Sequence, residues 1–171
     1  PHNAYQVPEP YFSMFDGDAY VPPETSAADV KHKNYRWQAM REKLAFALRN
    51  WDADAYIRRC RANYLGMLRL LDDQIRRFVT CLREQDLYDD TFILFLSDHG
   101  DYAGEYGLLR KGVDLPECLI RIPMIFAGHS VKQRPLDDPS LQGRYPSIVD
   151  VLPTVCDALD IPTPAHIQGH S

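Results

Sequence analysis

A single apolar stripe across residues 53–85 limits what this chain can fold into more than any other feature of the sequence. Apolar side chains recur there at steps of three and four residues, which is the spacing of one face of an α-helix. They are Ile57, Cys60, Tyr64, Leu68, Leu71, Ile75, Phe78 and Leu82. A straight helix of this length extends about 50 Å. We interpret the arginines between these positions as a solvated face, with a polyanion site as the alternative.

Two short apolar runs indicate that this helix belongs to an α/β domain. Residues 91–96 are apolar, β-branched or aromatic throughout, which is typical of a strand buried on both faces in a parallel sheet covered by helices. Residues 122–127 form a second run of this kind. Further helices are expected at 35–49 and at 150–160, where Asp150 would be the N-terminal cap. The order of these elements is that of an α/β protein.

Composition excludes several other classes of protein. The chain has 171 residues, of which 45% are hydrophobic, and a formal net charge of −5. This content is too apolar for a disordered chain, and no run approaches the roughly 20 residues that span a bilayer. The negative charge gives no overall attraction to nucleic acid or to an anionic membrane. Because the four cysteines have neither zinc-site nor redox spacing, we expect four buried free thiols.

The residues after the first apolar run carry the strongest chemical signal. Asp98, His99 and Gly100 follow the predicted strand, and a carboxylate beside an imidazole suits a divalent cation if the chain turns at the glycine. The same tripeptide also fits a simple turn, with Asp98 as a cap and His99 as a structural histidine. A glycine-rich loop then places Lys111 13 positions after Asp98. A metal and a lysine that face one pocket would bind a phosphate- or sulfate-like group.

Six segments in the same order resemble the sulfatases of the alkaline phosphatase superfamily. Any one of them is a weak match, but together they cover nearly the whole chain. They are residues 1–16 (PHxPY and PxxY), 64–75 (Y followed by LDDxI), 91–112 (the metal strand and substrate loop, with SDHG, GEYGL and KG), 117–125 (ExxxRIPMI), 149–154 (VDVLPT) and 161–169 (IPxPxxxQG).

The resemblance assigns roles to four residues of this sequence. It implies that Asp98 and His99 are two ligands of a divalent metal, which is usually calcium in sulfatases. It further implies that Lys111 binds the sulfate group and that His2 reaches the sulfate or its bridging oxygen as a catalytic residue. The fold implied is part of a three-layer α/β/α sandwich with a mostly parallel sheet, truncated at its N-terminus.

Departures from the family pattern sharpen these expectations. His99 stands where many relatives have Asn. As a metal ligand, an imidazole nitrogen favours manganese or another transition metal more than an amide oxygen does. Phosphonate monoester and phosphodiester hydrolases of the same superfamily also carry Asp-His. Sulfatases attack with a formylglycine made from Cys or Ser in the pattern (C/S)-x-P-x-R, and these 171 residues contain no such pattern. We therefore expect the formylglycine in a missing N-terminal part, and no turnover by the chain alone.

Sulfuric ester hydrolysis is accordingly the function that the sequence predicts. The alternatives are a phosphonate monoester or phosphodiester hydrolase on the same scaffold, or a non-catalytic domain that binds a metal or a sulfated glycan. The expected partner is a sulfated small molecule or glycan, with no nucleic acid and no membrane. Within one sulfatase-like domain, we expect an extended proline-rich active-site segment at 1–34, a central part at 35–128 and a C-terminal part at 129–171.

Overall fold

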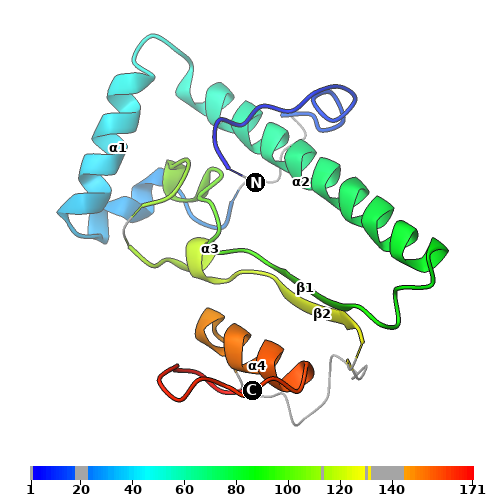
Figure 1. Cartoon of the computed structure of the whole chain (residues 1–171). Coiled ribbons are helices and arrows are strands. Elements are labelled where there is room, and N and C mark those ends of the chain that lie inside the picture. Colours follow the sequence, from blue (N-terminus) through cyan, green and yellow to red (C-terminus); the bar gives the residue numbers. More distant parts are fainter. Residues whose placement is uncertain (1, 18–22, 113, 130, 132–144) are drawn as a thin grey trace. The chain divides into compact units, whose positions relative to one another are not determined.

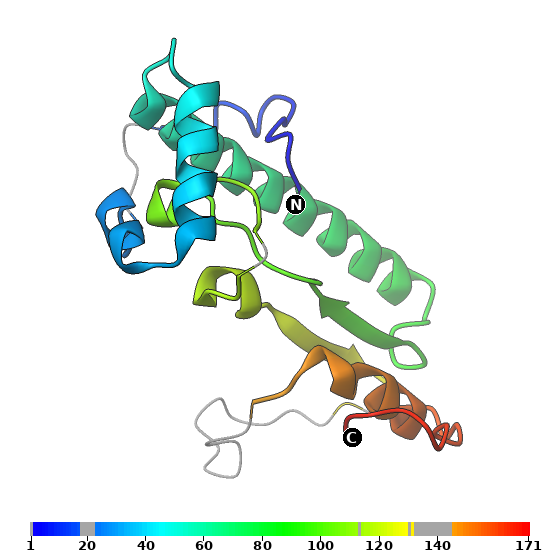
Figure 2. The same ribbon diagram turned by 90° about the vertical axis from the view of Figure 1, so that its left-hand side faces the viewer.

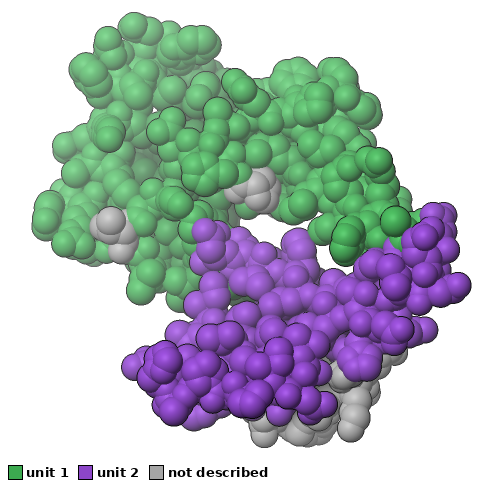
Figure 3. All heavy atoms as spheres, viewed as in Figure 1, with its two compact units in different colours: residues 1–81, 99–122 green, residues 82–98, 123–171 purple. Residues whose placement is uncertain are grey.

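The chain forms two compact units, which Figure 3 shows in different colours. The computed structural model describes residues 2–17, 23–112, 114–129, 131 and 145–171. Unit 1 consists of Pro1–Cys81 and His99–Ile122, and unit 2 of Leu82–Asp98 and Pro123–Ser171. Part of the predicted C-terminal segment, residues 132–144, lies outside the described residues. The predicted division into 1–34, 35–128 and 129–171 stays a prediction.

The long helix predicted from the apolar stripe is present as α2, Ala53–Glu84. Asp52 precedes it and accepts a hydrogen bond from the Ala55 amide at 2.9 Å, which satisfies one of the unpaired donors of the first turn. Arg69 and Arg76 pair along the helix with the two aspartates of the LDD segment, as Arg69 does with Asp73 at 2.9 Å. This part of the arginine face is thus compensated within the helix.

Helix α1, Tyr35–Ala47, confirms the helix predicted at 35–49, and Asn34 caps it by accepting from the Arg36 amide. Figures 1 and 2 show α1 followed by a short connection into α2. The extended chain expected before α1 is wrong for Ala27–His32, which form a 3-10 helix, η1. Ser26 explains the difference, because it forms a reciprocal capping box that starts this helix in spite of the proline-rich sequence before it.

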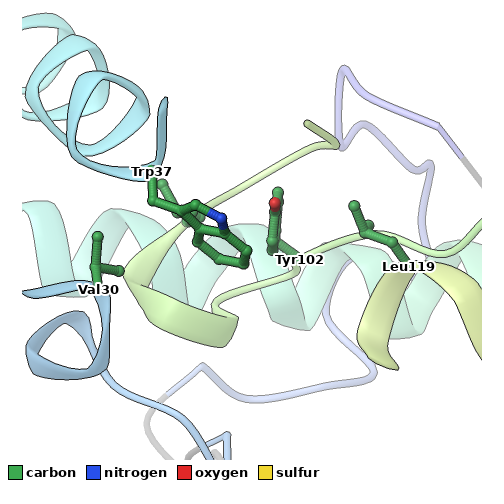
Figure 4. Close-up of a cluster of buried hydrophobic side chains, with 5 residues drawn as sticks. Val30, Trp37, Tyr102 and Leu119 are labelled. Carbon is green, nitrogen blue, oxygen red and sulfur yellow. The ribbon is translucent and has the colours of Figure 1, made fainter. Parts of the chain in front are cut away.

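The core of unit 1 is a small cluster built on an aromatic pair. Trp37 of α1 meets Tyr102 edge to face, with ring centroids 5.7 Å apart, and Tyr102 is only 1% exposed. Val30 of η1, together with Leu108 and Leu119, completes the buried set (Figure 4). Leu119 belongs to the short helix α3, Glu117–Ile120. The cluster fixes the loop that begins at His99, since Tyr102 and Leu108 both belong to that loop.

Unit 2 contains the two predicted strands, β1 at Phe92–Leu96 and β2 at Met124–Gly128. They pair antiparallel, with Leu94 opposite Phe126, so the parallel pairing expected from the unbroken apolar run is wrong for these two strands. Every residue of β1 is half-buried, whereas burial on both faces was expected. An apolar run reports how much surface a strand can bury, but the direction of its neighbour depends on the connection between them.

The last predicted helix is also present, as α4, Val151–Ala158, with Pro153 buried in its first turn. Asp150 makes no capping hydrogen bond to α4, so the predicted cap is wrong. Ser147 instead caps a 3-10 turn, η4 (Ile148–Asp150), that runs directly into α4. The carboxylate of Asp150 accepts from the amides of Ser147 and His170, and this ties the end of the chain to the helix start.

All four cysteines are free thiols, as expected. Cys60 and Cys156 are buried, Cys118 is half-buried and Cys81 is exposed, so the expected burial is wrong for Cys81. Cys81 falls one position before the stripe residue Leu82 and lies outside the stripe. In the described part of the chain, no helix is both long enough and apolar enough to cross a bilayer.

Candidate functional site

The loop from His99 to Gly112 is held in a closed, hairpin-like shape by its own backbone. The Tyr102 amide donates to the Arg110 carbonyl and the Gly104 amide donates to the Leu108 carbonyl, both at 2.8 Å. Its tip turns through positive φ angles, which include 56° at Tyr106. The loop therefore returns to its starting point, and residues far apart in sequence meet at its base.

Gly100 sets the position of this base. Its amide donates to the Leu119 carbonyl at 2.8 Å, and a Cβ atom at this position would lie 2.0 Å from the carbonyl oxygen of Cys118. Only a residue without a side chain allows the two backbone segments to come this close. The glycine of the Asp-His-Gly sequence is thus required by packing against α3.

His99 and Lys111 come together at the base of the loop. The Nζ atom of Lys111 lies 2.6 Å from Nε2 of His99, and Nδ1 of His99 lies 2.7 Å from the Gly100 carbonyl oxygen. Because a carbonyl can only accept, Nδ1 carries the proton and Nε2 carries the lone pair. The imidazole is therefore held as the neutral tautomer whose Nε2 can coordinate a metal or accept a proton.

His2 lies on the same unit but makes a different set of contacts. Its Nδ1 is 2.6 Å from the Asn3 carbonyl oxygen, and the side chain is exposed. Within the described residues, no hydrogen bond joins His2 to Lys111. Burial raises the pKa of the Asp101 carboxyl, and the nearby His2 side chain opposes that rise only weakly. The predicted placement of His2 beside a bound sulfate stays a prediction.

Asp101 anchors a network that the sequence reasoning missed. Its Oδ1 accepts from the Tyr5 hydroxyl at 2.9 Å and from the Ala103 amide at 2.8 Å. The Tyr5 hydroxyl in turn accepts from the Arg110 amide at 2.6 Å. Burial raises the pKa of Asp101, and burial followed by the Asp101 charge raises the pKa of Tyr5. One hydroxyl thus connects the segment that carries His2 to the loop that carries His99 and Lys111.

Asp98 lies two residues after β1 and ends the first segment of unit 2, whereas His99 begins the second segment of unit 1. The predicted sharing of one metal by these two side chains stays a prediction. Among the residues that the structure describes, no group of three or more His, Cys, Asp or Glu side chains is arranged to hold a metal ion.

A cavity of about 550 Å³ opens beside Lys111, wholly within unit 1. One wall comes from Met40 and Leu44 of α1 and from Leu48, which follows this helix, and another comes from the start of α2. The N-terminal segment and the end of the 99–112 loop complete it. The sequence contained no clear signal for this cavity, because α1 as a whole has no distinct apolar face.

The candidate site of this α/β chain places a lysine amine beside an imidazole, and the lysine also lines the cavity. The sequence model of the sulfatase family, described as Sulfatase, matches residues 2–161. The chain therefore belongs to the sulfatase family.

Curated relatives agree with this family. A choline-sulfatase of Rhizobium meliloti is 30% identical over 162 residues, which cover 94% of this chain and 30% of that protein. An arylsulfatase of Clostridium perfringens is 29% identical over 175 residues, which cover 100% of this chain and 34% of that protein. The chain thus spans about a third of the length of the relatives that it matches.

Solved structures confirm the fold class. A phosphonate monoester hydrolase from Silicibacter pomeroyi matches with a TM-score of 0.80 at 23% identity, over 100% of this chain and 34% of that one. The phosphonate monoester hydrolase of Agrobacterium radiobacter matches with a TM-score of 0.72 at 25% identity, over 100% of this chain and 35% of that one. The chain is a truncated α/β domain of the alkaline-phosphatase-like type.

Proposed function

We propose that the protein hydrolyses sulfuric esters and that this chain supplies the anion-binding and metal-binding part of the active site. The observation that carries the proposal is the 2.6 Å contact between Lys111 Nζ and His99 Nε2 in a chain of the sulfatase family. The substrate is a sulfated small molecule or glycan. The nucleophile is a formylglycine, which lies outside these 171 residues because none of their Cys or Ser residues has the required pattern.

The donor set of this chain fits a divalent metal at two positions. His99 Nε2 and the Asp98 carboxylate would be the two ligands from this chain, and the contact of His99 Nδ1 with the Gly100 carbonyl oxygen would orient the imidazole. We propose calcium as the metal, with manganese or another transition metal as the alternative that an imidazole ligand favours. When bound, the metal supplies positive charge to the transferring sulfate group.

Lys111 and His2 would then act on the substrate. If Nε2 of His99 held a metal, the amine of Lys111 would lose this acceptor and would be left to bind an anionic oxygen. The two positive groups would repel each other, and a bound sulfate would offset the repulsion. His2 would donate a proton to the bridging oxygen as the alcohol leaves.

The structural neighbours support a second candidate, which is hydrolysis of phosphonate monoesters or phosphodiesters. Two phosphonate monoester hydrolases share the fold of this chain across its whole length. Sulfate and phosphonate monoesters both present negatively charged oxygens to the same imidazole and amine. Rates of the full-length protein on phenyl sulfate and on phenyl phosphonate separate the two, and we expect sulfate to be preferred.

Binding measurements on the 171-residue chain test the assigned roles directly. Calorimetry with inorganic sulfate in the presence of calcium is expected to show binding that Lys111→Gln weakens about tenfold, since a charge-assisted contact is lost. Lys31→Gln, an exposed lysine of η1, is the control for the same change of charge. Calcium binding is expected to be lost in Asp98→Ala.

Three results would contradict this assignment. Turnover of an aryl sulfate by the 171-residue chain would show that a nucleophile lies within it. Sulfate affinity that is equal in Lys111→Gln and Lys31→Gln would remove Lys111 from the site. Calcium affinity unchanged in Asp98→Ala would do the same for the proposed metal ligand.

A further inference from the structure

The cavity beside Lys111 has two different kinds of lining. Met40 and Leu44 of α1 form an apolar wall with Leu48, which follows the helix and is 8% exposed. Its volume, about 550 Å³, is within the range of pockets that take small organic ligands. The wall on its own would suit a ring or a short alkyl chain.

The remaining lining is positively charged to an extent that a sulfate ester does not require. The lining residues that the structure describes include no carboxylate and four basic side chains, which are Lys43, Arg59, Arg110 and Lys111. Arg59 is committed elsewhere, because its Nη2 donates to the Asn63 side chain at 2.6 Å and to the Phe12 carbonyl at 2.8 Å. In the described part of the chain, neither Lys43 nor the Arg110 guanidinium has a carboxylate partner.

The charge of Arg110 acts on the inner polar groups of the cavity. Burial raises the pKa of the Cys60 thiol, and the Cys60 charge raises the pKa of the Tyr56 hydroxyl; the Arg110 charge opposes both rises. Both groups line the cavity. The Arg110 guanidinium, which also lines the cavity, thus contributes positive charge to it.

We propose that this cavity receives the alcohol part of the substrate and that this part has an apolar body with an anionic group of its own. The inference rests on the proposed function, in which Lys111 at the cavity mouth binds the sulfate. Lys43 and Arg110 bind the second anion, while Met40, Leu44 and Leu48 cover the apolar body. The substrate class is thus a sulfate ester of a carboxylated or otherwise acidic aromatic or alkyl alcohol.

The physical reason is the positive charge of Lys43 and Arg110, both of which are exposed. A neutral alcohol part gains nothing from these charges, and a cationic one is repelled by them. A carboxylate is favoured, because it accepts charge-assisted hydrogen bonds from an amine and a guanidinium together.

Three phenyl sulfates that differ only at the para position test the proposal. They carry a carboxylate, a methyl group or a trimethylammonium group, and calorimetry measures their affinity for the 171-residue chain in the presence of calcium. We expect the carboxylate to bind about tenfold tighter than the methyl compound and the trimethylammonium compound to bind weakest. Lys43→Gln and Arg110→Gln should each reduce the ratio of carboxylate to methyl affinity about threefold. Lys31→Gln, the matched control outside the cavity, should leave it unchanged.

Each possible outcome has a defined meaning. Equal affinities for the three compounds, or a preference that persists in Lys43→Gln and Arg110→Gln, would overturn the inference while Lys111-dependent sulfate binding still supported the proposed function. A carboxylate preference that depends on Lys43 and Arg110, without any effect of Lys111→Gln, would uphold the anion site and contradict the proposed function. Binding of none of the three compounds would overturn the inference.

Discussion

Replacing Tyr5 by Phe tests the network at the centre of the candidate site. The substitution removes only the hydroxyl, which donates to Asp101 at 2.9 Å and accepts from the Arg110 amide at 2.6 Å. The ring keeps its edge-to-face contact with Tyr64, at a centroid separation of 6.3 Å. The loss therefore measures the two hydrogen bonds with little change in packing.

The expected cost follows from the partners left behind. A hydrogen bond to a charged group is worth about 1.5–3 kcal/mol, and Asp101 is half-buried, so its carboxylate cannot replace the hydroxyl fully with water. The Arg110 amide belongs to a more exposed residue and adds less. We expect Tyr5→Phe to lower the free energy of unfolding by about 2–3 kcal/mol, which is a large part of the stability of a small domain.

Tyr11→Phe provides a matched control on the same helix surface. Its hydroxyl donates to Asp73 at 3.1 Å, but that carboxylate keeps its ion pair with Arg69 at 2.9 Å when the hydroxyl is removed. We expect a cost below about 1 kcal/mol. Urea unfolding followed by the fluorescence of the buried Trp37 measures both variants. Equal losses in the two variants would refute the reasoning, because they would show that the Tyr5 hydroxyl has no special role.

Three further predictions concern the glycine and cysteine positions. Gly100→Ala should lower stability by about 2–4 kcal/mol in urea unfolding, because its Cβ would lie 2.0 Å from the Cys118 carbonyl oxygen, whereas Gly17→Ala, with 3.6 Å to its nearest neighbours, should be nearly neutral. Burial raises the pKa of the Cys118 thiol to about 11. The unfolded chain therefore loses this proton at a lower pH than the folded chain does, and the free energy of unfolding should fall between about pH 9 and 11. Cys118→Ala should remove that part of the slope, and an unchanged slope would contradict the assignment. A maleimide should label exposed Cys81 well before buried Cys60, as peptide mapping would show.

The sequence was sufficient where a signal repeats along the chain. The apolar stripe predicted α2 to within one residue at its C-terminal end, because each turn of the helix adds an independent confirmation of its period. The helix expected at 150–160 was likewise found, as α4, with Pro153 in its first turn, where the missing amide costs nothing. The run at 91–96 predicted a strand, yet it contained no information on the direction of its partner.

The site was less accessible to sequence reasoning for a physical reason. His99 and Lys111 are 12 positions apart in one loop, so a local pattern could nominate both. Tyr5 and Asp101 are 96 positions apart, and neither residue type is unusual where it stands. Their hydrogen bond depends on packing of the N-terminal segment against α2, where the Asn63 side chain donates to the Tyr5 carbonyl at 2.9 Å. Contacts of this kind follow from the tertiary structure alone.

The backbone of the 99–112 loop has a mechanical consequence. The hydrogen bonds from Tyr102 to Arg110 and from Gly104 to Leu108 join the two sides of the loop. They lie between its tip and its base, and His99 and Lys111 are at the base. Gly100 is bonded to Leu119 and Tyr102 is buried in the core, so both ends of the pair are attached to one braced frame. The separation of the imidazole and the amine is therefore set by the backbone of this chain. A substrate would meet a pair that is already assembled.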